Sequence, residues 1–450
     1  MAQLLCVDFG STFTKAALVD SSGEVVATAA TPTTIGTDVL DGYRLLREQL
    51  DVHGVVDEVL ACSSAGGGLR LTVVGYEREV TAQAGYRVGL SAGARVSHLV
   101  AGPMSGADLA ELRATRPDLV LLVGGTDGGN AEVLLHNASR MARARLGAPV
   151  VVAGNREAQA EVAEALESTG RRFTLADNVL PSIGVIAPES ARAAIRAAFL
   201  EHVIGGKGLS RGPEFAAMVQ APTPDAVLDG VEVLAEQLDG DVMVVDVGGA
   251  TTDVYSALRP QGEDAGLAKD VVAPLWQSRT VEADLGMRWN AVGVVEAAAR
   301  EHVDVPEGLE AYAARVAADP AHLPVDAVER GHDLALARAA ALVAVRRHAR
   351  PSGPGASARP LADVAVVVGS GGVLRHADED GRAHVLGAVA TDHAGGWKVP
   401  RAAAVVTDAA YLLFAVGLLR SSHPDTARAL ARAVVGEHGR HPSEVAAPGR

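Results

Sequence analysis

Two segments of the chain, 238 residues apart, carry the same short pattern. In residues 4–15 and again in residues 242–253, a run of apolar residues meets an aspartate, Asp8 or Asp246, and a glycine follows two positions later. An apolar run of this length predicts a buried strand, and the Asp-x-Gly predicts a tight turn with free backbone N–H groups. Such a turn can surround a phosphate while the aspartate holds a divalent cation through water. The repeat therefore predicts two similar lobes whose turns close on one nucleotide from opposite sides.

A third segment extends this pattern. Residues 364–375 predict another buried strand, which runs into the glycine-rich residues 369–372, and glycine lets a backbone approach a flat ligand such as a purine closely. The three segments, in this order, resemble the two phosphate loops and the adenosine loop of the actin-like ATPase superfamily, which includes actin, the DnaK-type chaperones and the sugar and acetate kinases. The resemblance implies an α/β fold with two ribonuclease-H-like lobes and a nucleotide cleft between them.

The same resemblance implies ATP and Mg²⁺ as cofactors and assigns roles to single residues. Asp8 and Asp246 are expected to hold the magnesium ion or the attacking water, and are therefore both metal-binding and catalytic. Lys15 follows Asp8 by seven residues, as a lysine does in actin, and is expected at the β- and γ-phosphates; the alternative is a solvated lysine. Asp253 is either a further residue of the site or a turn residue. The other expected nucleotide-binding residues are Gly10, Ser11, Thr12, Thr14, Gly248, Gly249, Thr251, Thr252, Gly369, Ser370, Gly371 and Gly372.

A glycine-rich segment, residues 124–130, follows another predicted strand. Ligands of open α/β sheets bind at the carboxyl ends of strands, so Asp127 in this segment is a candidate catalytic residue that positions water, or a residue that senses a partner. The alternative is a glycine-rich turn in which Asp127 caps a helix. By resemblance to the DnaK-type chaperones, residues 282–286 are expected near the sugar of the nucleotide.

The length of 450 residues predicts more than one domain. We expect an N-terminal lobe over 1–240, with an inserted strand-helix-strand unit at 149–176, and a C-terminal lobe over 241–420. A helix from Val405 to Leu419 is expected to pack back between the lobes. Residues 436–450 are expected to form a disordered tail.

Charge and cysteine usage exclude several classes of function. A net charge of −15 argues against nucleic-acid binding, which needs a basic face. The two cysteines, Cys6 and Cys62, lie in predicted core strands and form no disulfide framework, as fits a reducing compartment. The chain shows no secretion signal, and the apolar stretch 402–419 is short for a membrane span, so we expect a cytoplasmic protein without membrane contact.

Three further segments, residues 61–70, 124–130 and 280–289, together with the phosphate loops, resemble the glutamate mutase accessory family (GlmL/MutL). The resemblance extends from about residue 3 to about residue 420. It implies a chaperone-like ATPase that protects or reactivates an adenosylcobalamin-dependent mutase, and so implies mutase subunits as protein partners. A homodimer is left open.

Three other classes of protein are alternatives to this interpretation. A small-molecule kinase has the same two-lobed architecture, although no sugar- or acetate-binding signature is evident. The iron–sulfur ATPases that activate hydroxyacyl-CoA dehydratases need cysteines at a dimer interface, whereas Cys6 and Cys62 are expected to be buried in neighbouring strands. A nucleotide-binding scaffold without turnover is the third alternative. The P-loop pattern is absent from the sequence.

Overall fold

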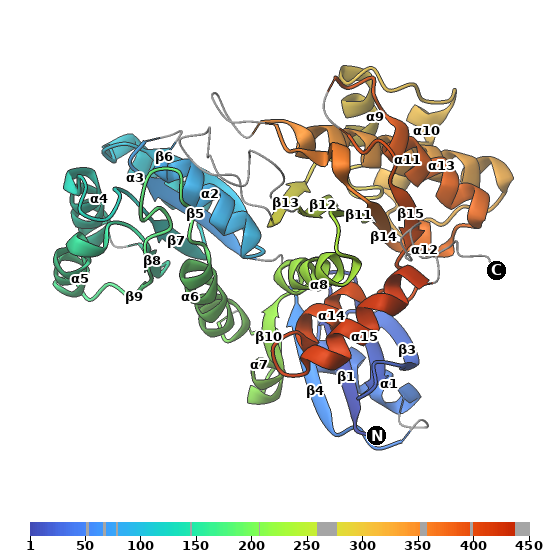
Figure 1. Ribbon diagram of the computed structural model, residues 1–450, viewed down its shortest axis with the longest axis horizontal. Helices are drawn as coiled ribbons and strands as arrows, with labels where there is room; N and C mark the ends of the chain where they lie inside the picture. The colour runs from blue at the N-terminus through green and yellow to red at the C-terminus, as the bar shows by residue number, and fades with distance from the viewer. Residues whose placement is uncertain are drawn as a thin grey trace, which may run out of the picture.

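A computed structural model shows three five-stranded sheets joined by helices (Figure 1). It describes residues 1–436 except 51–53, 66–68, 78–79, 145, 207, 259–276, 352–357 and 397–398. The predicted tail at 436–450 lies outside the described residues, apart from Gly436. Among the described helices, none is long and apolar enough to cross a membrane.

The sheet of the N-terminal lobe has the strand order β10-β4-β1-β2-β3. β1 is antiparallel to β2 and parallel to β4, while β2 and β3 form an antiparallel hairpin. Apolar side chains fill β1 on both faces, as expected for a strand covered on both sides. The elements of this lobe are β1 (Gln3–Phe9), β2 (Phe13–Asp20), β3 (Val25–Pro32), α1 (Val39–Leu50), β4 (Glu58–Ser63), α7 (Pro213–Met218), β10 (Val219–Pro222) and α8 (Thr223–Leu238).

The sheet of the C-terminal lobe repeats this topology as β15-β14-β11-β12-β13, with the same alternation of antiparallel and parallel pairs. The predicted α/β fold with two similar lobes is therefore confirmed. The elements of this lobe are β11 (Val242–Val247), β12 (Thr252–Ala257), β13 (Gln277–Glu282), α9 (Ala291–Arg300), α10 (Leu309–Ala318), α11 (Ala327–Ala349), β14 (Val366–Ser370), α12 (Gly372–His376), α13 (Glu379–Thr391) and β15 (Ala404–Thr407).

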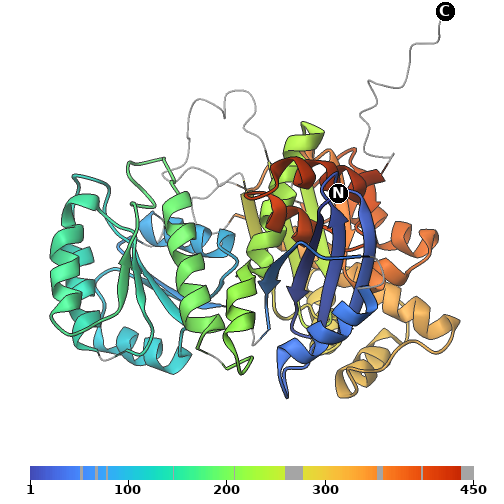
Figure 2. The same ribbon diagram turned by 90° about the horizontal axis from the view of Figure 1, so that it is seen from below.

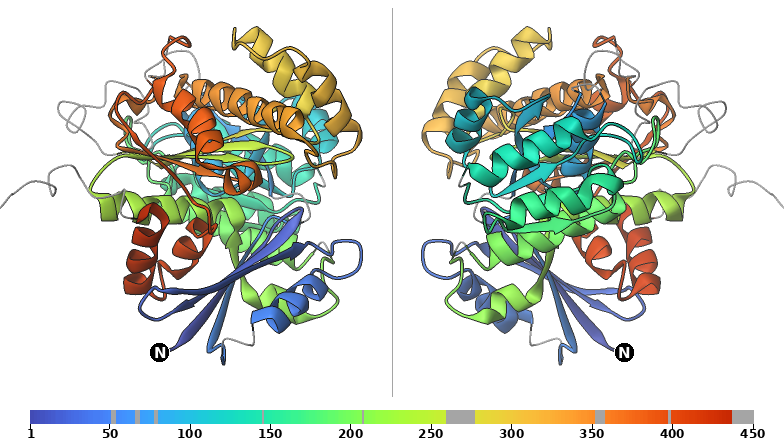
Figure 3. Two further views of the ribbon diagram at one scale, coloured as in Figure 1. Left: turned by 90° about the vertical axis from the view of Figure 1, so that its right-hand side faces the viewer. Right: turned by 90° about the vertical axis from the view of Figure 1, so that its left-hand side faces the viewer.

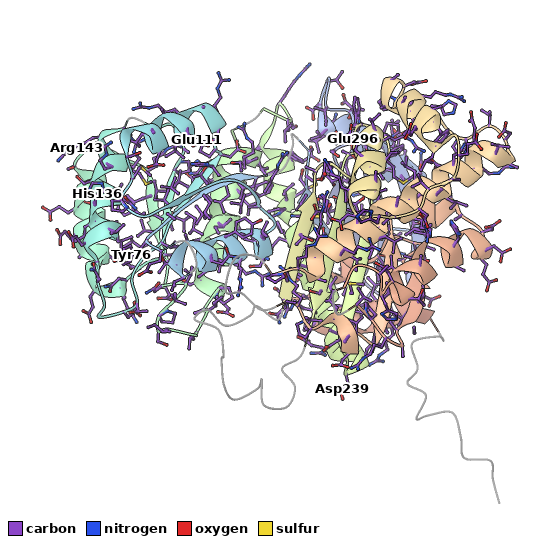
Figure 4. All side chains as sticks on the ribbon, turned by 90° about the horizontal axis from the view of Figure 1, so that it is seen from above. Tyr76, Glu111, His136, Arg143, Asp239 and Glu296 are labelled. Atoms are coloured by element: carbon purple, nitrogen blue, oxygen red, sulfur yellow. The ribbon has the colours of Figure 1, made fainter. Side chains whose placement is uncertain are left out.

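The third sheet lies between β4 and β10 in the sequence and beside the two lobes in space (Figure 2). All its strands are parallel, in the order β6-β5-β7-β8-β9, which is the order of flavodoxin-like doubly wound sheets. We call it the parallel-sheet unit; it carries Tyr76, Glu111, His136 and Arg143 in Figure 4. Its elements are β5 (Arg70–Gly75), α2 (Thr81–Ser91), β6 (Arg95–Ala101), α3 (Gly106–Thr115), β7 (Leu119–Leu122), α4 (Glu132–Arg143), β8 (Val150–Val152), α5 (Gln159–Glu167), β9 (Phe173–Leu175) and α6 (Glu189–Phe199).

The strand-helix-strand segment expected at 149–176 is the β8-α5-β9 part of this larger sheet. The two strands of this segment, β8 and β9, are short runs that can be recognised separately in the sequence. Their order in the sheet depends on contacts between distant segments. The parallel-sheet unit has a core of its own and also shares one apolar cluster with the N-terminal lobe.

Helix α8 runs between the two lobes, with α14 (Leu413–Leu419) and α15 (Pro424–Val435) beside it (Figure 3). The three helices contribute to one apolar cluster that includes strands of both lobes. The predicted continuous helix from Val405 to Leu419 is wrong, because Val405 and Val406 pair with β14 as part of β15. Its second half is α14, which packs back between the lobes as expected.

Candidate functional site

The two repeated turns have the same geometry. The backbone N–H of Gly10 donates to the carbonyl of Phe13, at 3.1 Å, and the N–H of Gly248 donates to the carbonyl of Thr251, at 2.9 Å. A side chain at either glycine would meet the acceptor carbonyl, because a Cβ would lie 2.5 Å from the oxygen of Phe13 or 2.8 Å from that of Thr251. Glycine is therefore needed for the turn itself.

The two hairpins also share a register. Asp8 pairs with Lys15 across the first hairpin, and Asp246 pairs with Asp253 across the second. Lys15 and Asp253 are thus equivalent positions that carry opposite charges. Directly opposed residues lie on the same face of a sheet, so each aspartate shares a face with its partner.

The neighbouring threonines, Thr14 and Thr252, are both fully buried. The hydroxyl of Thr14 hydrogen-bonds that of Thr33, at 3.1 Å, and the hydroxyl of Thr252 donates to the carbonyl of Leu285, at 2.6 Å. Both hydroxyls are therefore engaged within the protein, although the sequence analysis placed them at the nucleotide. By contrast, Ser11 and Thr12 are exposed.

Side chains from both lobes meet around Lys15. Its ammonium lies 3.2 Å from the centre of the Tyr411 ring, and Tyr411 belongs to the segment between β15 and α14. Burial raises the pKa values of Asp8, Asp246 and Asp408, and the positive charge of Lys15 partly offsets the rise in each, which places all three carboxylates in its electrostatic range. We call these five residues the interlobe site. The structure thus brings together Asp8, Lys15 and Asp246, as the sequence predicts.

Asp8 is buried at the centre of the interlobe site. The hydroxyl of Thr223, the first residue of α8, donates to its carboxylate at 2.5 Å, and the Cys62 thiol lies 3.7 Å from it. Burial raises the pKa of Asp8, while the charge of Lys15 and hydrogen bonds from Thr223, Cys62 and Tyr411 lower it; the net pKa is raised. Burial with little compensating charge therefore disfavours the ionised carboxylate.

Burial disfavours the ionised form of Asp246 as well. Burial raises its pKa to about 6; the charge of Lys15 and a hydrogen bond from Ser370 lower it, and the charges of Asp253 and Asp8 raise it. The charge of Asp8 raises the pKa of Asp246, and a divalent cation near both carboxylates would favour both ionised forms. Among the described residues, no cluster of three or more metal-ligating side chains occurs. Mg²⁺ commonly uses only one or two carboxylates together with phosphates, so the pair is sufficient on chemical grounds.

The four residues of the predicted adenosine loop have different surroundings. A Cβ at Gly369 would overlap Leu386 of the core, and a Cβ at Gly371, where φ is +104°, would overlap the carbonyl oxygen of Val247. Both glycines are thus required by packing. At Gly372 a Cβ would meet nothing within 4 Å, so Gly372 borders open space at the start of α12.

Residues 287–289, which follow β13, form hydrogen bonds to the backbone of the second turn. The N–H of Met287 donates to the carbonyl of Gly248, and the N–H groups of Arg288 and Trp289 donate to that of Gly249, at 2.8 and 3.0 Å. The family-like residues 280–289 therefore hold the second turn in place. Glu282 and Asp284, expected near the sugar, both pair with Arg347 of α11.

Asp127 lies outside the interlobe site. It follows β7 in the parallel-sheet unit, where its carboxylate accepts hydrogen bonds from the backbone of Arg156, at 2.9 Å, and from the Asn178 side chain, at 2.8 Å. Its own N–H donates to the carbonyl of Pro181. These contacts tie three loops of the same sheet together, and the structure does not bring Asp127 together with Asp8.

Both hairpins connect to the parallel-sheet unit near Gly93, which follows α2. In the second hairpin, the Thr251 hydroxyl donates to Asp253, at 3.0 Å, and Asp253 pairs with the buried Arg279, at 2.9 Å. Arg279 also donates to the carbonyl of Gly93, at 3.2 Å. A Cβ at Gly93 would lie 2.8 Å from the N–H nitrogen of Asp225 on α8, so this turn also packs against the helix whose first residue binds Asp8.

A network of charges fixes α8 to the parallel-sheet unit as well. Asp225 is fully buried and pairs with Arg192 and Arg196 of α6. Asp229 pairs with the same two arginines and with Arg420, which follows α14. Helix α8 therefore joins Asp8 at one end to the parallel-sheet unit along its side.

Three residues of these contacts were missed from the sequence: Tyr411, Thr223 and Arg279. Thr223 lies between Pro222 and Pro224 at the start of a predicted helix, which is a recognisable helix-start signal. Tyr411 and Arg279 carry no local signal, because their roles depend on partners in other parts of the chain.

Comparisons with known proteins show similarity over nearly the whole chain. The family model described as MutL protein matches residues 4–435. The chain is 36% identical to Protein MutL of Clostridium tetanomorphum over 453 residues, which cover 95% of this chain and 98% of that protein. Among solved structures, an ATP-dependent caprolactamase from Pseudomonas jessenii is 16% identical, with a TM-score of 0.39 over 93% of this chain and 70% of that one. An acetone carboxylase in a nucleotide-free structure is also 16% identical, with a TM-score of 0.38 over 92% and 70%.

Proposed function

The chain belongs to the MutL protein family, and on this premise we propose that it binds and hydrolyses ATP to protect or reactivate an adenosylcobalamin-dependent mutase such as glutamate mutase. The observation that carries the proposal is the convergence of two matched hairpin turns, with Asp8, Asp246 and Lys15 between them. A scaffold would need neither carboxylate, and burial makes both energetically costly without a cation.

The residues of the interlobe site have separate tasks in this proposal. Asp8 and Asp246 hold Mg²⁺ through its water shell, and Lys15 takes the β- and γ-phosphates. Bound Mg²⁺ would neutralise phosphate charge and favour attack by water. Thr223 fixes one carboxylate oxygen of Asp8 and so orients the other toward the site. The exposed Ser11 and Thr12 supply N–H and hydroxyl donors.

Work on a partner protein requires that the partner bind the nucleotide-bound and nucleotide-free forms with different affinity. Two contacts support the parallel-sheet unit as the part that carries the change. Arg279 connects Asp253 of the second hairpin to Gly93, and α8 connects Thr223 to the arginines of α6. We therefore expect slow basal turnover that increases when mutase subunits are present.

The test is a reactivation assay. Mutase blocked with hydroxocobalamin is incubated with this protein, fresh adenosylcobalamin, Mg²⁺ and ATP, and mutase activity is followed. Recovery should require hydrolysable ATP and should fail with Asp8→Asn, because loss of one preorganised charge in such a site typically lowers the rate by about 10²–10³.

Two outcomes would contradict the proposal. Recovery at the same rate without this protein, together with no binding to the mutase, would exclude the accessory role. ADP formation that depends on a small acceptor, rather than on the mutase, would instead identify a small-molecule kinase.

A further inference from the structure

The Lys15 ammonium contacts an aromatic ring rather than a carboxylate. Three carboxylates, those of Asp8, Asp246 and Asp408, lie within its electrostatic range. Across the part of the chain that the structure describes, however, no ion pair or side-chain hydrogen bond of Lys15 is present. Its ammonium lies over the ring of Tyr411 instead, 3.2 Å from the ring centre.

Tyr411 is held firmly in this position. Its φ of +57° is unusual for a bulky residue, which persists there only where surrounding contacts fix it. Its N–H donates to the carbonyl of Asp408, and the Asp408 carboxylate accepts from the N–H groups of Leu412 and Leu413. The ring also contacts Phe414 of α14, with ring centres 5.5 Å apart. The segment between β15 and α14 thus presents the ring to Lys15 from the other lobe.

We propose that Tyr411 is a positioning residue for the phosphate-binding lysine: its ring holds the Lys15 ammonium away from the surrounding carboxylates and so keeps it available for the phosphates of a nucleotide. A cation over an aromatic face is attracted to it, and the attraction is strongest where water is excluded. Without the ring, Lys15 would form an ion pair with one of these carboxylates, and a nucleotide would first have to break that ion pair. This inference rests on the proposed nucleotide site.

Two substitutions separate the ring from the hydroxyl. Tyr411→Phe keeps the aromatic face and removes only the hydroxyl, whereas Tyr411→Leu removes the face and keeps apolar bulk. Dissociation constants for ATP and for adenosine are measured by equilibrium dialysis in the presence of Mg²⁺. Both variants lose the hydrogen bond from the Tyr411 hydroxyl to Asp8, so the difference between them reports the ring alone. We expect Tyr411→Leu to bind ATP about thirtyfold more weakly than Tyr411→Phe, the size of a desolvated cation–π contact. Adenosine has no phosphate, so its affinity should be the same in all three proteins.

A double-mutant cycle assigns the effect to Lys15. In a Lys15→Met background, Tyr411→Leu and Tyr411→Phe should bind ATP equally well, because the ring then has no ammonium to position. Loss of adenosine and ATP affinity together would mean that Tyr411 has only a structural role. Equal losses in Tyr411→Phe and Tyr411→Leu would assign the effect to the hydroxyl, and an unchanged ATP affinity in Tyr411→Leu would overturn the inference. If the parent binds no ATP, the proposed function itself fails.

A second measurement needs no nucleotide. The chain has only four lysines, Lys15, Lys207, Lys269 and Lys398, so reductive ¹³C-methylation gives few NMR signals. Methylation keeps the charge of the ammonium. The Lys15 methyl signal, assigned with Lys15→Arg, should be shifted upfield by the ring current in the parent and in Tyr411→Phe, and unshifted in Tyr411→Leu. An unshifted Lys15 signal in the nucleotide-free parent would refute the inference even if ATP binds.

Discussion

Replacing Asp246 with asparagine should stabilise the nucleotide-free protein while it abolishes nucleotide turnover. Burial is the largest cause of the raised pKa of this carboxyl, which is about 6 in place of the ordinary 3.8. Since each pKa unit corresponds to about 1.4 kcal/mol, the ionised carboxylate lowers the free energy of unfolding by up to about 3 kcal/mol at neutral pH. Asparagine has the same shape, can still accept from Ser370, and carries no charge.

The sign of the pH dependence follows from the direction of the shift. A carboxyl whose pKa is raised on folding contributes stability below its unfolded pKa, and this contribution is lost as the pH rises through the folded value. The advantage of Asp246→Asn over the parent should therefore be about 1 kcal/mol at pH 4.5 and up to about 3 kcal/mol at pH 7.5. Urea unfolding at both pH values, without nucleotide, measures the difference.

Asp253→Asn is the matched control in the same hairpin. Asp253 pairs with the buried Arg279, so its removal leaves a buried cation without a partner and should cost about 3–5 kcal/mol at pH 7.5. The two substitutions thus have opposite expected signs. Adding MgATP should stabilise the parent and have little effect on Asp246→Asn. A variant Asp246→Asn that is less stable than the parent, or equally more stable at both pH values, would refute the reasoning.

Further predictions concern one buried histidine and three glycines. Burial lowers the pKa of His348 well below its ordinary value, so the parent should lose about 1.4 kcal/mol of stability relative to His348→Gln for each pH unit below about 6, which unfolding of both proteins between pH 7 and 5 measures. Gly417→Ala should lower the free energy of unfolding by about 1–3 kcal/mol, because a Cβ there would overlap the carbonyl of Ala226 on α8. Gly387→Ala in α13, where a Cβ has open space, should be neutral or stabilising. Equal changes in the free energy of unfolding for Gly417→Ala and Gly387→Ala would contradict the predicted overlap between α14 and α8. Gly372→Val should weaken ATP binding without a change in melting temperature; unchanged affinity would remove Gly372 from the purine site.

The sequence analysis recovered those parts of the fold that are encoded locally. Both hairpins, the strand before Gly369 and the long helix α11 each have a pattern of their own, and their repeated order predicted two similar lobes. β15 was missed because its short apolar run lies in an alanine-rich stretch, where a strand and a buried helix have the same composition. Strands β7, β8 and β9 of the parallel-sheet unit are equally short or shorter, and the sequence contains no signal for the order of the strands in that sheet.

The positions of the candidate site residues follow only in part from local sequence. Successive side chains of a strand point to opposite faces, so once Lys15 is assigned to the site, its neighbour Thr14 must face the other way. The same rule separates Asp253 from Thr252. The burial of Thr14 and Thr252 therefore follows from the alternation of side chains along each strand. Tyr411, in contrast, could not have been predicted, because its contact with Lys15 joins residues from opposite ends of the chain.

The arrangement of α14 and α15 has a consequence for synthesis of the protein. These helices are made well after β1 and β4, yet they pack with α8 over apolar side chains of both strands, among them Leu4, Cys6 and Leu60. A ribosome adds about 5–20 residues per second, so roughly 10–40 s separate the end of α8 from the end of α15. During this time the first sheet of the nascent chain lacks part of its cover.

A chain interrupted before residue 413 would keep this face exposed, and exposed apolar strands promote aggregation. Two segments that are distant in the sequence are therefore coupled: the sheet of the N-terminal lobe is translated well before the helices that complete its cover. Truncation before residue 413 should consequently damage the N-terminal lobe, although all residues of its sheet are still present.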